Sequence, residues 1–415
     1  IGAAYYLVNL PEIGGLSNLI KHENVVGKIS IFPDFSDTEA LIGIFIIPLA
    51  VQWWSAWYPG AEPGGGGYIA QRMLAAKNEN HAIGATFFFN IMHYALRPWP
   101  WILVALASLV LYPDLASIQT AFPNVEESKL GHDLAYSAML TKLPPGLMGL
   151  VLASLGSAYM STISTHLNWG SSYIVYDFYK QNIDKNASER KLVNVGRIST
   201  VILMLFSALL ALVLTNALQL FEIILMFGAG TGLIFILRWF WWRINAWSEI
   251  SAMFASGVIS ILLNFTSLKT LLFDHKIDGG ILVEGVFPAW AKFPLVVLIT
   301  TIVWVVITFL TKPEKDETLR EFYKQTTPGG PGWKKVLNTF SDTEFIEKET
   351  TKKWSVPSGI LAMVLGCILV YSTMFATGNI LYGNYNIALG LLVLIIISSV
   401  LLIILWKKNK LSTLS

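Results

Sequence analysis

The sequence predicts an all-α polytopic membrane protein, and its composition, its aromatic content and its uncharged runs point to that class. Of the 415 residues, 54% are hydrophobic and only 13% are charged, about half the ~25% of a soluble globular protein. The 15 Trp and 15 Tyr belong to the residue types that collect where a membrane meets water. Cys367 is the only cysteine, which excludes an internal disulfide framework and a cysteine-built metal site. A net charge of +2 gives no reason to expect nucleic-acid binding.

Nine runs of the chain are long and apolar enough to cross a membrane. A spanning helix needs about 20 largely apolar residues. The runs lie near residues 41–58, 83–112, 147–174, 198–215, 218–240, 248–266, 291–311, 357–376 and 387–406. Residues 356–406 carry no Asp, Glu, Lys or Arg, and a polar break at 377–386 divides them. The last two spans are therefore predicted to form a helical hairpin.

The distribution of Lys and Arg predicts the orientation of the spans. If the segment before the first complete span lies outside, the inward loops hold 20 basic residues and the outward segments hold six. Positively charged loops stay on the cytoplasmic side. We therefore expect the loop 312–354, which has turn signals at Pro328–Gly332, and the C-terminus to be cytoplasmic.

Polar groups interrupt the first span. The run from Trp53 to Pro63 is followed by the four glycines Gly64–Gly67, and no straight helix is compatible with this stretch. Backbone that opens at membrane depth is tolerated where it lines a cavity, and broken helices mark the binding sites of transporters. The alternative is that the span ends at Tyr58 and a flexible loop follows it.

A second polar cluster lies within the next span. Asn90, His93 and Arg97 are three and four residues apart, which places them on one face of a helix. A guanidinium facing lipid would be costly, so this face should point into a wet cavity or toward an acidic partner, unless Arg97 reaches the interface or pairs structurally. Pro98 and Pro100 predict a kink. We expect Asn90 and His93 to face a central cavity with residues around Trp57 and Tyr58.

Hydroxyl side chains form a stripe along the third span, at residues 154, 157, 161, 162, 165 and 172. Such a stripe commonly lets helices pack closely. The functional alternative is an alkali-cation site, because Ser161, Thr162 and the carbonyl of Ala158 would supply three neutral oxygens.

The segment Gly228–Gly232 is rich in glycine, but it lies within an apolar span and is better explained by close helix packing. No metal-ligand, phosphate-loop or nucleophile pattern indicates an enzyme or an organic cofactor.

Three motifs resemble one known family. Residues 158–162, Ala-Tyr-Met-Ser-Thr, running on to 171–180, resemble the eighth core helix of the sodium:solute symporter family. That family includes sodium-coupled sugar, proline, pantothenate and iodide carriers. Residues 68–77 resemble its Gln-Arg-x-x-Ala-Ala-Lys segment, and residues 238–250 resemble the cytoplasmic end of its tenth core helix. The matches run in order across residues 1–270.

The resemblance implies the LeuT-type fold, in which two inverted five-helix repeats hold the solute between broken helices. This chain would supply the second repeat plus extra C-terminal helices. Residues 1–240 would end the fifth core helix and form helices six to ten, 241–311 would add further spans, 312–354 would form the loop, and 355–415 the hairpin and tail. The sequence has no initiator Met, so we expect a fragment whose first four core helices precede residue 1 and which does not transport by itself.

The resemblance also assigns sites. Ser55, Trp57 and Tyr58 would contact the solute, and His93 falls where sugar-transporting members place a polar, solute-contacting side chain. Ala158, Ser161 and Thr162 would bind Na⁺ together with groups from the first core helix.

The predicted function is secondary active transport and no enzymatic activity. Na⁺ entry would drive uptake of a small polar solute, a sugar, an amino acid or an organic anion, by alternating access. The expected partners are this solute, Na⁺ and membrane lipid. The alternatives are a proton-coupled or facilitative carrier and a non-transporting membrane sensor or scaffold of the same fold. We expect a multi-pass protein of the cell membrane, in a bacterium the inner membrane.

Overall fold

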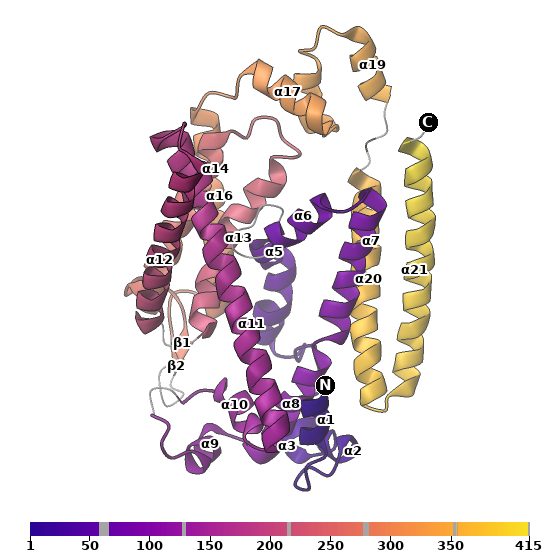
Figure 1. Cartoon of the computed structure of the whole chain (residues 1–415). Helices are drawn as coiled ribbons and strands as arrows, with labels where there is room; N and C mark the ends of the chain where they lie inside the picture. Colours follow the sequence, from indigo (N-terminus) through magenta and orange to yellow (C-terminus); the bar gives the residue numbers. More distant parts are fainter. Residues whose placement is uncertain are drawn as a thin grey trace. The chain divides into compact units, whose positions relative to one another are not determined.

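The computed structural model describes residues 1–57, 66–126, 130–213, 217–276, 282–351, 354 and 356–413. This part of the chain is mostly helical and contains one short antiparallel ribbon (Figure 1). It divides into two compact units. The first unit comprises Ile1–Ile29, Arg97–Gln219 and Ile380–Gly383, and the second comprises Ser30–Leu96, Leu220–Asn379 and Asn384–Ser415.

The first unit contains several short helices packed around one apolar helix, followed by two long helices. Its elements are α1 (Gly2–Val8), α2 (Leu16–Leu19), α3 (Glu23–Val26), α8 (Trp99–Leu111), α9 (Leu115–Ala121), α10 (Leu134–Leu140), α11 (Pro145–Ser172), the π-helix η5 (Tyr173–Ile183) and α12 (Glu189–Val213). The short helices and α8 share a hydrophobic core in which Leu7, Leu19 and Met139 have no exposed surface. Local signals fix the helix starts: the Asp114 side chain accepts from the Ser117 backbone N–H at 2.7 Å and caps α9.

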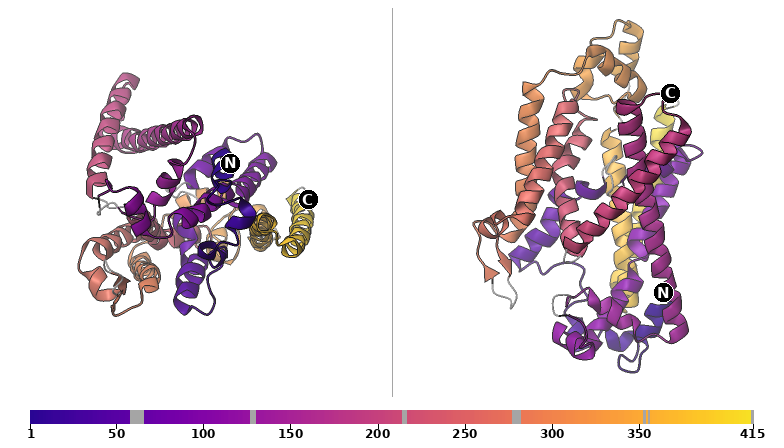
Figure 2. Two further views of the ribbon diagram at one scale, coloured as in Figure 1. Left: turned by 90° about the horizontal axis from the view of Figure 1, so that it is seen from below. Right: turned by 60° about the vertical axis from the view of Figure 1, so that its left-hand side comes forward.

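The helices α11 and α12 pack where small residues meet. The Ser171 hydroxyl donates to the Gly196 carbonyl at 2.9 Å, and Gly170 contacts Leu203. These small residues allow the two helices to approach closely. Figure 2 shows that α12 crosses α11 at an angle. Lys191 Nζ, in the first turn of α12, donates at 2.7 Å to Oδ2 of Asp184 in the preceding loop, and this hydrogen bond holds the pKa of Asp184 below its ordinary value.

The second unit holds the remaining apolar helices. Its elements, besides those of the segment 312–351, are α4 (Thr38–Ala40), the π-helices η1 (Leu41–Ile46) and η2 (Pro48–Gln52), α5 (Trp54–Trp57), α6 (Gly66–Leu74), α7 (Glu79–Asn90), the π-helix η3 (Ile91–Leu96), most of α13 (Ala217–Leu237), α14 (Ala246–Phe265), α15 (Leu268–Leu272), β1 (His275–Lys276), β2 (Leu282–Val283), the 3₁₀ helix η6 (Ala289–Ala291), α16 (Lys292–Leu310), α20 (Val356–Leu381) and α21 (Tyr385–Thr413). In the β1–β2 ribbon His275 pairs with Val283 and Lys276 with Leu282.

Buried polar contacts join α14 to α16. Asn245 caps α14 and also donates through Nδ2 to Thr311 Oγ1 at 2.9 Å. One turn further, Thr308 Oγ1 donates to Ser248 Oγ at 2.6 Å. Ser248 and Thr308 are both fully buried. Buried hydrogen bonds of this kind fix the register of two apolar helices.

Residues 312–351 fold into a small structure that we call the inter-helix module. It contains α17 (Asp316–Thr326), the 3₁₀ helix η7 (Pro331–Trp333), α18 (Lys334–Leu337) and α19 (Thr343–Thr351). Leu319, Tyr323 and Trp333 lie at the centre of its own hydrophobic core. The predicted turn is present, with positive φ at Gly329 (62°) and Gly330 (77°).

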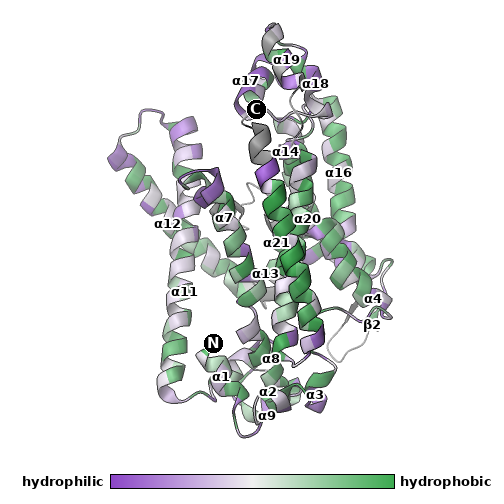
Figure 3. Ribbon diagram, turned by 90° about the vertical axis from the view of Figure 1, so that its right-hand side faces the viewer, coloured by the Kyte–Doolittle hydropathy of each residue, from purple (hydrophilic) through white to green (hydrophobic). Residues whose placement is uncertain are grey.

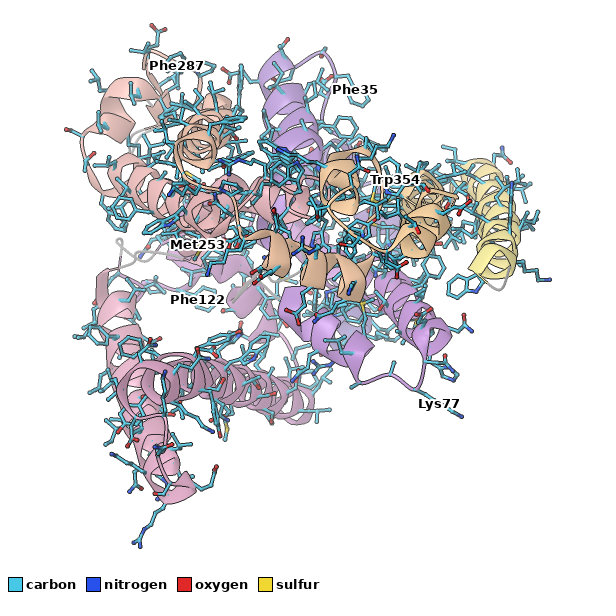
Figure 4. All side chains as sticks on the ribbon, turned by 90° about the horizontal axis from the view of Figure 1, so that it is seen from above. Phe35, Lys77, Phe122, Met253, Phe287 and Trp354 are labelled. Carbon is cyan, nitrogen blue, oxygen red and sulfur yellow. The ribbon has the colours of Figure 1, made fainter. Side chains whose placement is uncertain are left out.

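The inter-helix module contacts the segment between α13 and α14. Trp333 Nε1 donates to the Trp239 carbonyl at 2.9 Å, and the Lys335 ammonium lies 4.5 Å from the ring centroid of Trp242. On its other side, the Trp354 ring (labelled in Figure 4) lies against Gly330 so closely that a side chain there would collide with it. The module is therefore a packed element of the second unit.

Seven helices of the described chain are long and apolar enough to cross a membrane: Glu79–Leu111, Pro145–Ile183, Glu189–Leu212, Ala246–Phe265, Ala289–Leu310, Val356–Leu381 and Tyr385–Lys408. Two shorter apolar helices, Thr38–Gln52 and Phe221–Leu237, complete the set. Each of the nine predicted spans coincides with one of these helices. Figure 3 shows apolar residues along α16, α20 and α21 and polar residues on α17. The chain is thus a polytopic, multi-pass membrane protein.

Candidate functional site

The first group of candidate residues lies on α5. Ser55 has 4% of its surface exposed, and its hydroxyl has no hydrogen-bond partner among the described residues. A buried hydroxyl without a partner is uncommon, and this makes Ser55 a candidate ligand contact. Trp57 ends α5, and its side chain lies outside the described part of the chain, as does the whole of Tyr58. The predicted break of the first span lies mostly within residues 58–65, which are also outside it.

The neighbouring segment shows an unexpected helix geometry. Before α5 the chain forms π-helical turns over Leu41–Ile46 and Pro48–Gln52. A π-turn closes i→i+5 hydrogen bonds and is frequent at functional sites. In this span the sequence predicted an α-helix up to the Trp53–Pro63 run.

Asn90 and His93 lie at another junction between an α-helix and a π-helix. Asn90 ends α7, is half-buried, and donates through Nδ2 to the Thr86 carbonyl at 2.8 Å. His93 lies in η3, and its ring stacks on Phe89 with centroids 4.8 Å apart and planes at 19°. Tyr94 meets the His93 ring edge to face, also at 4.8 Å. The imidazole is therefore in contact with two aromatic rings.

Arg97 belongs to the first unit, whereas Asn90 and His93 belong to the second. Its guanidinium lies 4.7 Å from the ring centroid of Trp101, a cation–π distance. The helix is interrupted at the predicted position, because η3 ends at Leu96 and α8 begins at Trp99 with Pro98 as its N-cap residue. Pro98 lacks a backbone donor, which explains why the helix stops there.

The three candidate sodium ligands lie on successive turns of α11. Thr162 Oγ1 donates to the Ala158 carbonyl at 2.9 Å, so two of the three predicted oxygens are adjacent. The Ser161 carbonyl accepts from Thr165 Oγ1 at 2.8 Å. Ala158, Ser161 and Thr162 are all exposed.

The hydrogen bond from Thr162 is compatible with a cation site. A hydroxyl that donates its proton keeps two lone pairs, so Thr162 Oγ1 can bind a cation while it donates to the Ala158 carbonyl. That carbonyl lies within α11 and also accepts a backbone N–H, so a cation bound there would replace or share one of its two hydrogen bonds.

The structure also brings together residues that sequence reasoning did not combine. Trp54 Nε1 donates to the Ala229 carbonyl of α13 at 2.9 Å, and Gly228 lies against the Ser55 backbone. Close packing at Gly228–Gly232 was predicted from the glycines, but its partners lie about 175 residues away in the chain and have no sequence signal.

Two ion pairs join α13 to its neighbours. Glu222 Oε2 lies 3.8 Å from Lys292 Nζ, which also donates to Asn264 Oδ1 at 3.2 Å. At the other end of α13, Arg238 Nη1 donates to Glu249 Oε1 at 3.2 Å.

Comparison with known proteins identifies the family. The model of the sodium:solute symporter family matches residues 7–256. The chain is 29% identical over 217 residues to a sodium/glucose cotransporter of Vibrio parahaemolyticus, which covers 51% of this chain and 40% of that relative. It is 29% identical over 272 residues to the sodium/myo-inositol cotransporter 2 of Mus musculus, covering 61% of this chain and 39% of that relative.

A third relative, the sodium/glucose cotransporter 4 of Mus musculus, is 27% identical over 270 residues, with 60% of this chain and 38% of that relative covered. The chain thus spans about two fifths of the length of the curated relatives that it matches. The family match covers more than half of the chain, and it includes every candidate residue described above. The chain belongs to the sodium:solute symporter family.

Proposed function

We propose that the protein containing this chain is a secondary active transporter that couples Na⁺ entry to uptake of a small polar solute by alternating access. Family membership supports this function, and one observation supports a particular set of oxygen atoms as the sodium site. Ala158 O and Thr162 Oγ1 lie 2.9 Å apart beside Ser161, on an exposed face of a membrane-spanning helix. Neutral oxygens suit a monovalent cation that must be released again.

The proposed solute is a sugar or a polyol. Two relatives are described as glucose cotransporters and one as a myo-inositol cotransporter. A partnerless Ser55 hydroxyl and an imidazole flanked by Phe89 and Tyr94 are side chains that suit such a solute, because polyols combine many hydroxyls with faces that stack on aromatic rings. Trp57, Tyr58 and Asn90 complete the proposed solute site.

The proposed fold is the LeuT type, with α1 ending the fifth core helix, the segment from η1 to α6 forming the broken sixth, and the apolar helices from α7 to α13 supplying the seventh to tenth. The π-helical turns that precede α5 support a sixth helix that departs from regular α-geometry. In this proposal residues 241–415 add further spans, the inter-helix module and the C-terminal hairpin. The transporter performs no covalent chemistry and needs no organic cofactor. It lies in the cell membrane, in a bacterium the inner membrane, with its C-terminus in the cytoplasm.

Uptake measurements test the function. The full-length protein would be reconstituted in vesicles and supplied with labelled glucose, myo-inositol or proline, under an inward gradient of Na⁺ or of protons. We expect uptake of one of these solutes to require the Na⁺ gradient. Uptake driven equally well by protons alone would favour the proton-coupled alternative, and neither uptake nor Na⁺ binding would favour a sensor or scaffold.

A further inference from the structure

The position of α5 is set by one contact with α13. A methyl group at Gly228 would collide with the carbonyl oxygen of Ser55 and would also lie within 3.1 Å of its Cα. The two backbones are therefore in direct contact at this point, and only glycine permits it. In Figure 1, α5 lies beside α13.

A second contact fixes α5 next to this glycine. The Trp54 indole N–H donates to the carbonyl of Ala229 at 2.9 Å. Trp54 is 9% exposed, Ala229 is fully buried, and the two pack with Val297 of α16 in one hydrophobic cluster. The hydrogen bond sets the rotation of α5, whereas the contact at Gly228 sets its distance from α13.

The opposite face of α13 is closed by other helices. Residues two apart on an α-helix point about 200° apart, so Gly230 faces away from Gly228. A methyl group at Gly230 would lie 2.7 Å from Ser256 Cβ and 2.8 Å from Thr300 Oγ1. Ser256 is itself held, because its hydroxyl donates to the Phe227 carbonyl at 2.8 Å.

This arrangement leaves one way to accommodate a larger residue at position 228. The helix α13 cannot move back, because α14 and α16 are in contact with it at Gly230, and close-packed interiors do not absorb an added methyl group without a shift. The element α5 must move, and Ser55 and Trp57 move with it.

We propose that Gly228 and Trp54 are positioning residues of the solute site: they hold α5 against α13 at the depth and rotation that present Ser55 to the solute. This inference rests on the proposed function, since Ser55 is one of its candidate solute contacts. Neither Gly228 nor Trp54 need touch the solute. The helix α16 begins after the residues that match the family model, so its contact with α13 and Trp54 extends the support of the site beyond the matched region.

The test compares two glycine variants in the full-length protein. Gly228→Ala introduces the collision, and Gly359→Ala makes the same change on α20, where nothing lies within 4 Å of the added methyl group. We expect Gly228→Ala to raise the half-saturating concentration of the transported solute about fivefold or more. The half-saturating Na⁺ concentration should stay unchanged, as should both values for Gly359→Ala. Trp54→Phe, which removes the hydrogen bond but keeps a ring, should raise the half-saturating solute concentration and leave the half-saturating Na⁺ concentration unchanged.

A second measurement does not depend on transport. With Cys367→Ser as background, Trp57→Cys provides a single thiol on α5 whose rate of labelling by a small reagent reports the placement of that element. Gly228→Ala should change this rate at least about twofold, and Gly359→Ala should leave it unchanged. If the wild type shows no sodium-driven uptake, the proposed function fails and the labelling rate alone decides the positioning role.

The inference is overturned if Gly228→Ala leaves both the labelling rate and the solute concentration unchanged. It is also overturned if the substitution only lowers the amount of folded protein, because a merely structural glycine would do that without changing either measured value.

Discussion

At the scale of single residues, α11 carries hydroxyls of similar local geometry that differ in their predicted role. Thr162 and Ser164 both donate to the carbonyl four residues earlier, at 2.9 and 2.8 Å, and both are exposed. They point about 200° apart on the helix. A hydrogen bond within the helix therefore cannot distinguish a cation ligand from a solvated hydroxyl, but a pair of matched substitutions can.

We predict that Ser161→Ala and Thr162→Ala each raise the Na⁺ concentration for half-maximal uptake about tenfold, because each removes one oxygen ligand worth about 1–2 kcal/mol. Thr162→Ser keeps the hydroxyl and should stay near the wild type, and Ser164→Ala should have no effect. Uptake is measured against Na⁺ at fixed solute. Wild-type sodium dependence in both alanine variants would show that the stripe serves helix packing.

His93 is the corresponding residue of the proposed solute site. Its ring contacts both Phe89 and Tyr94, so it is oriented before a solute arrives. We predict that His93→Ala raises the half-saturating solute concentration about fivefold, the equivalent of about one hydrogen bond, and leaves the sodium dependence unchanged. The control is His81→Ala, because His81 is exposed at the start of α7 and contacts Asn78. Unchanged solute affinity in His93→Ala would remove His93 from the site.

The candidate residues could be found from the sequence to different degrees. Ala158 and Thr162 were predicted as neighbours because a helix fixes the distance between residues four apart, and the structure has them in contact. The contact between Trp54 and Ala229 joins residues 175 positions apart. Nothing in a single sequence specifies such a pairing. The ion pair of Glu222 with Lys292 escaped prediction for the same reason.

At the scale of elements, prolines and apolar runs allowed helices and their breaks to be predicted from the sequence, whereas the π-helices could not be predicted. Pro98 and Pro100 predicted the break between η3 and α8, because proline lacks the donor that would continue the helix. The π-turns of η1, η2 and η3 have apolar sequences like those of ordinary spans. A π-turn depends on the packing of its surroundings, so hydrophobic periodicity does not reveal it.

The inter-helix module is the element that the sequence described least completely. Its mixed charges and its turn residues predicted a loop, and the turn is present at Gly329 and Gly330. A signal for its core was nevertheless available, since Phe322, Tyr323 and Trp333 give an unusual aromatic density for a solvated loop. Buried together, such rings stabilise a small structure strongly.

The stability of this module should depend on Trp333. The residue is 3% exposed and its indole donates to the Trp239 carbonyl, so Trp333→Ala should destabilise the module by about 3–5 kcal/mol. Trp333→Phe keeps most of the buried area and should cost about 1–2 kcal/mol through the unpaired carbonyl and the lost volume. Protease cleavage within residues 312–351 is the measurement, and Trp247→Ala, an exposed position on α14, is the control. Equal cleavage of all variants would contradict the role of Trp333.

At the scale of the whole molecule, the helices beyond the matched region are part of the second unit and not an appendage. The family model ends at residue 256, within α14, yet α13 is tied to α16 through Glu222 and Lys292 and to α14 through Arg238 and Glu249. The contacts at Gly230 lie between these two ion pairs. We expect α13, α14 and α16 to move as one body during alternating access, because separating them would break contacts at both ends and in the middle.

The orientation of this body in the membrane follows from charge. All basic residues of the inter-helix module and of the C-terminal tail count among the 20 that the proposed topology places inside, against six outside. We predict that a cysteine at the exposed position Ser341, introduced with Cys367→Ser, reacts with a membrane-impermeant thiol reagent only after the cells are permeabilised. A cysteine at Lys21, which lies on the predicted outer side, should react in intact cells and serves as the control. Labelling of the Ser341→Cys variant in intact cells would reverse the predicted topology, and with it the side of the membrane to which the proposed α11 site would release Na⁺.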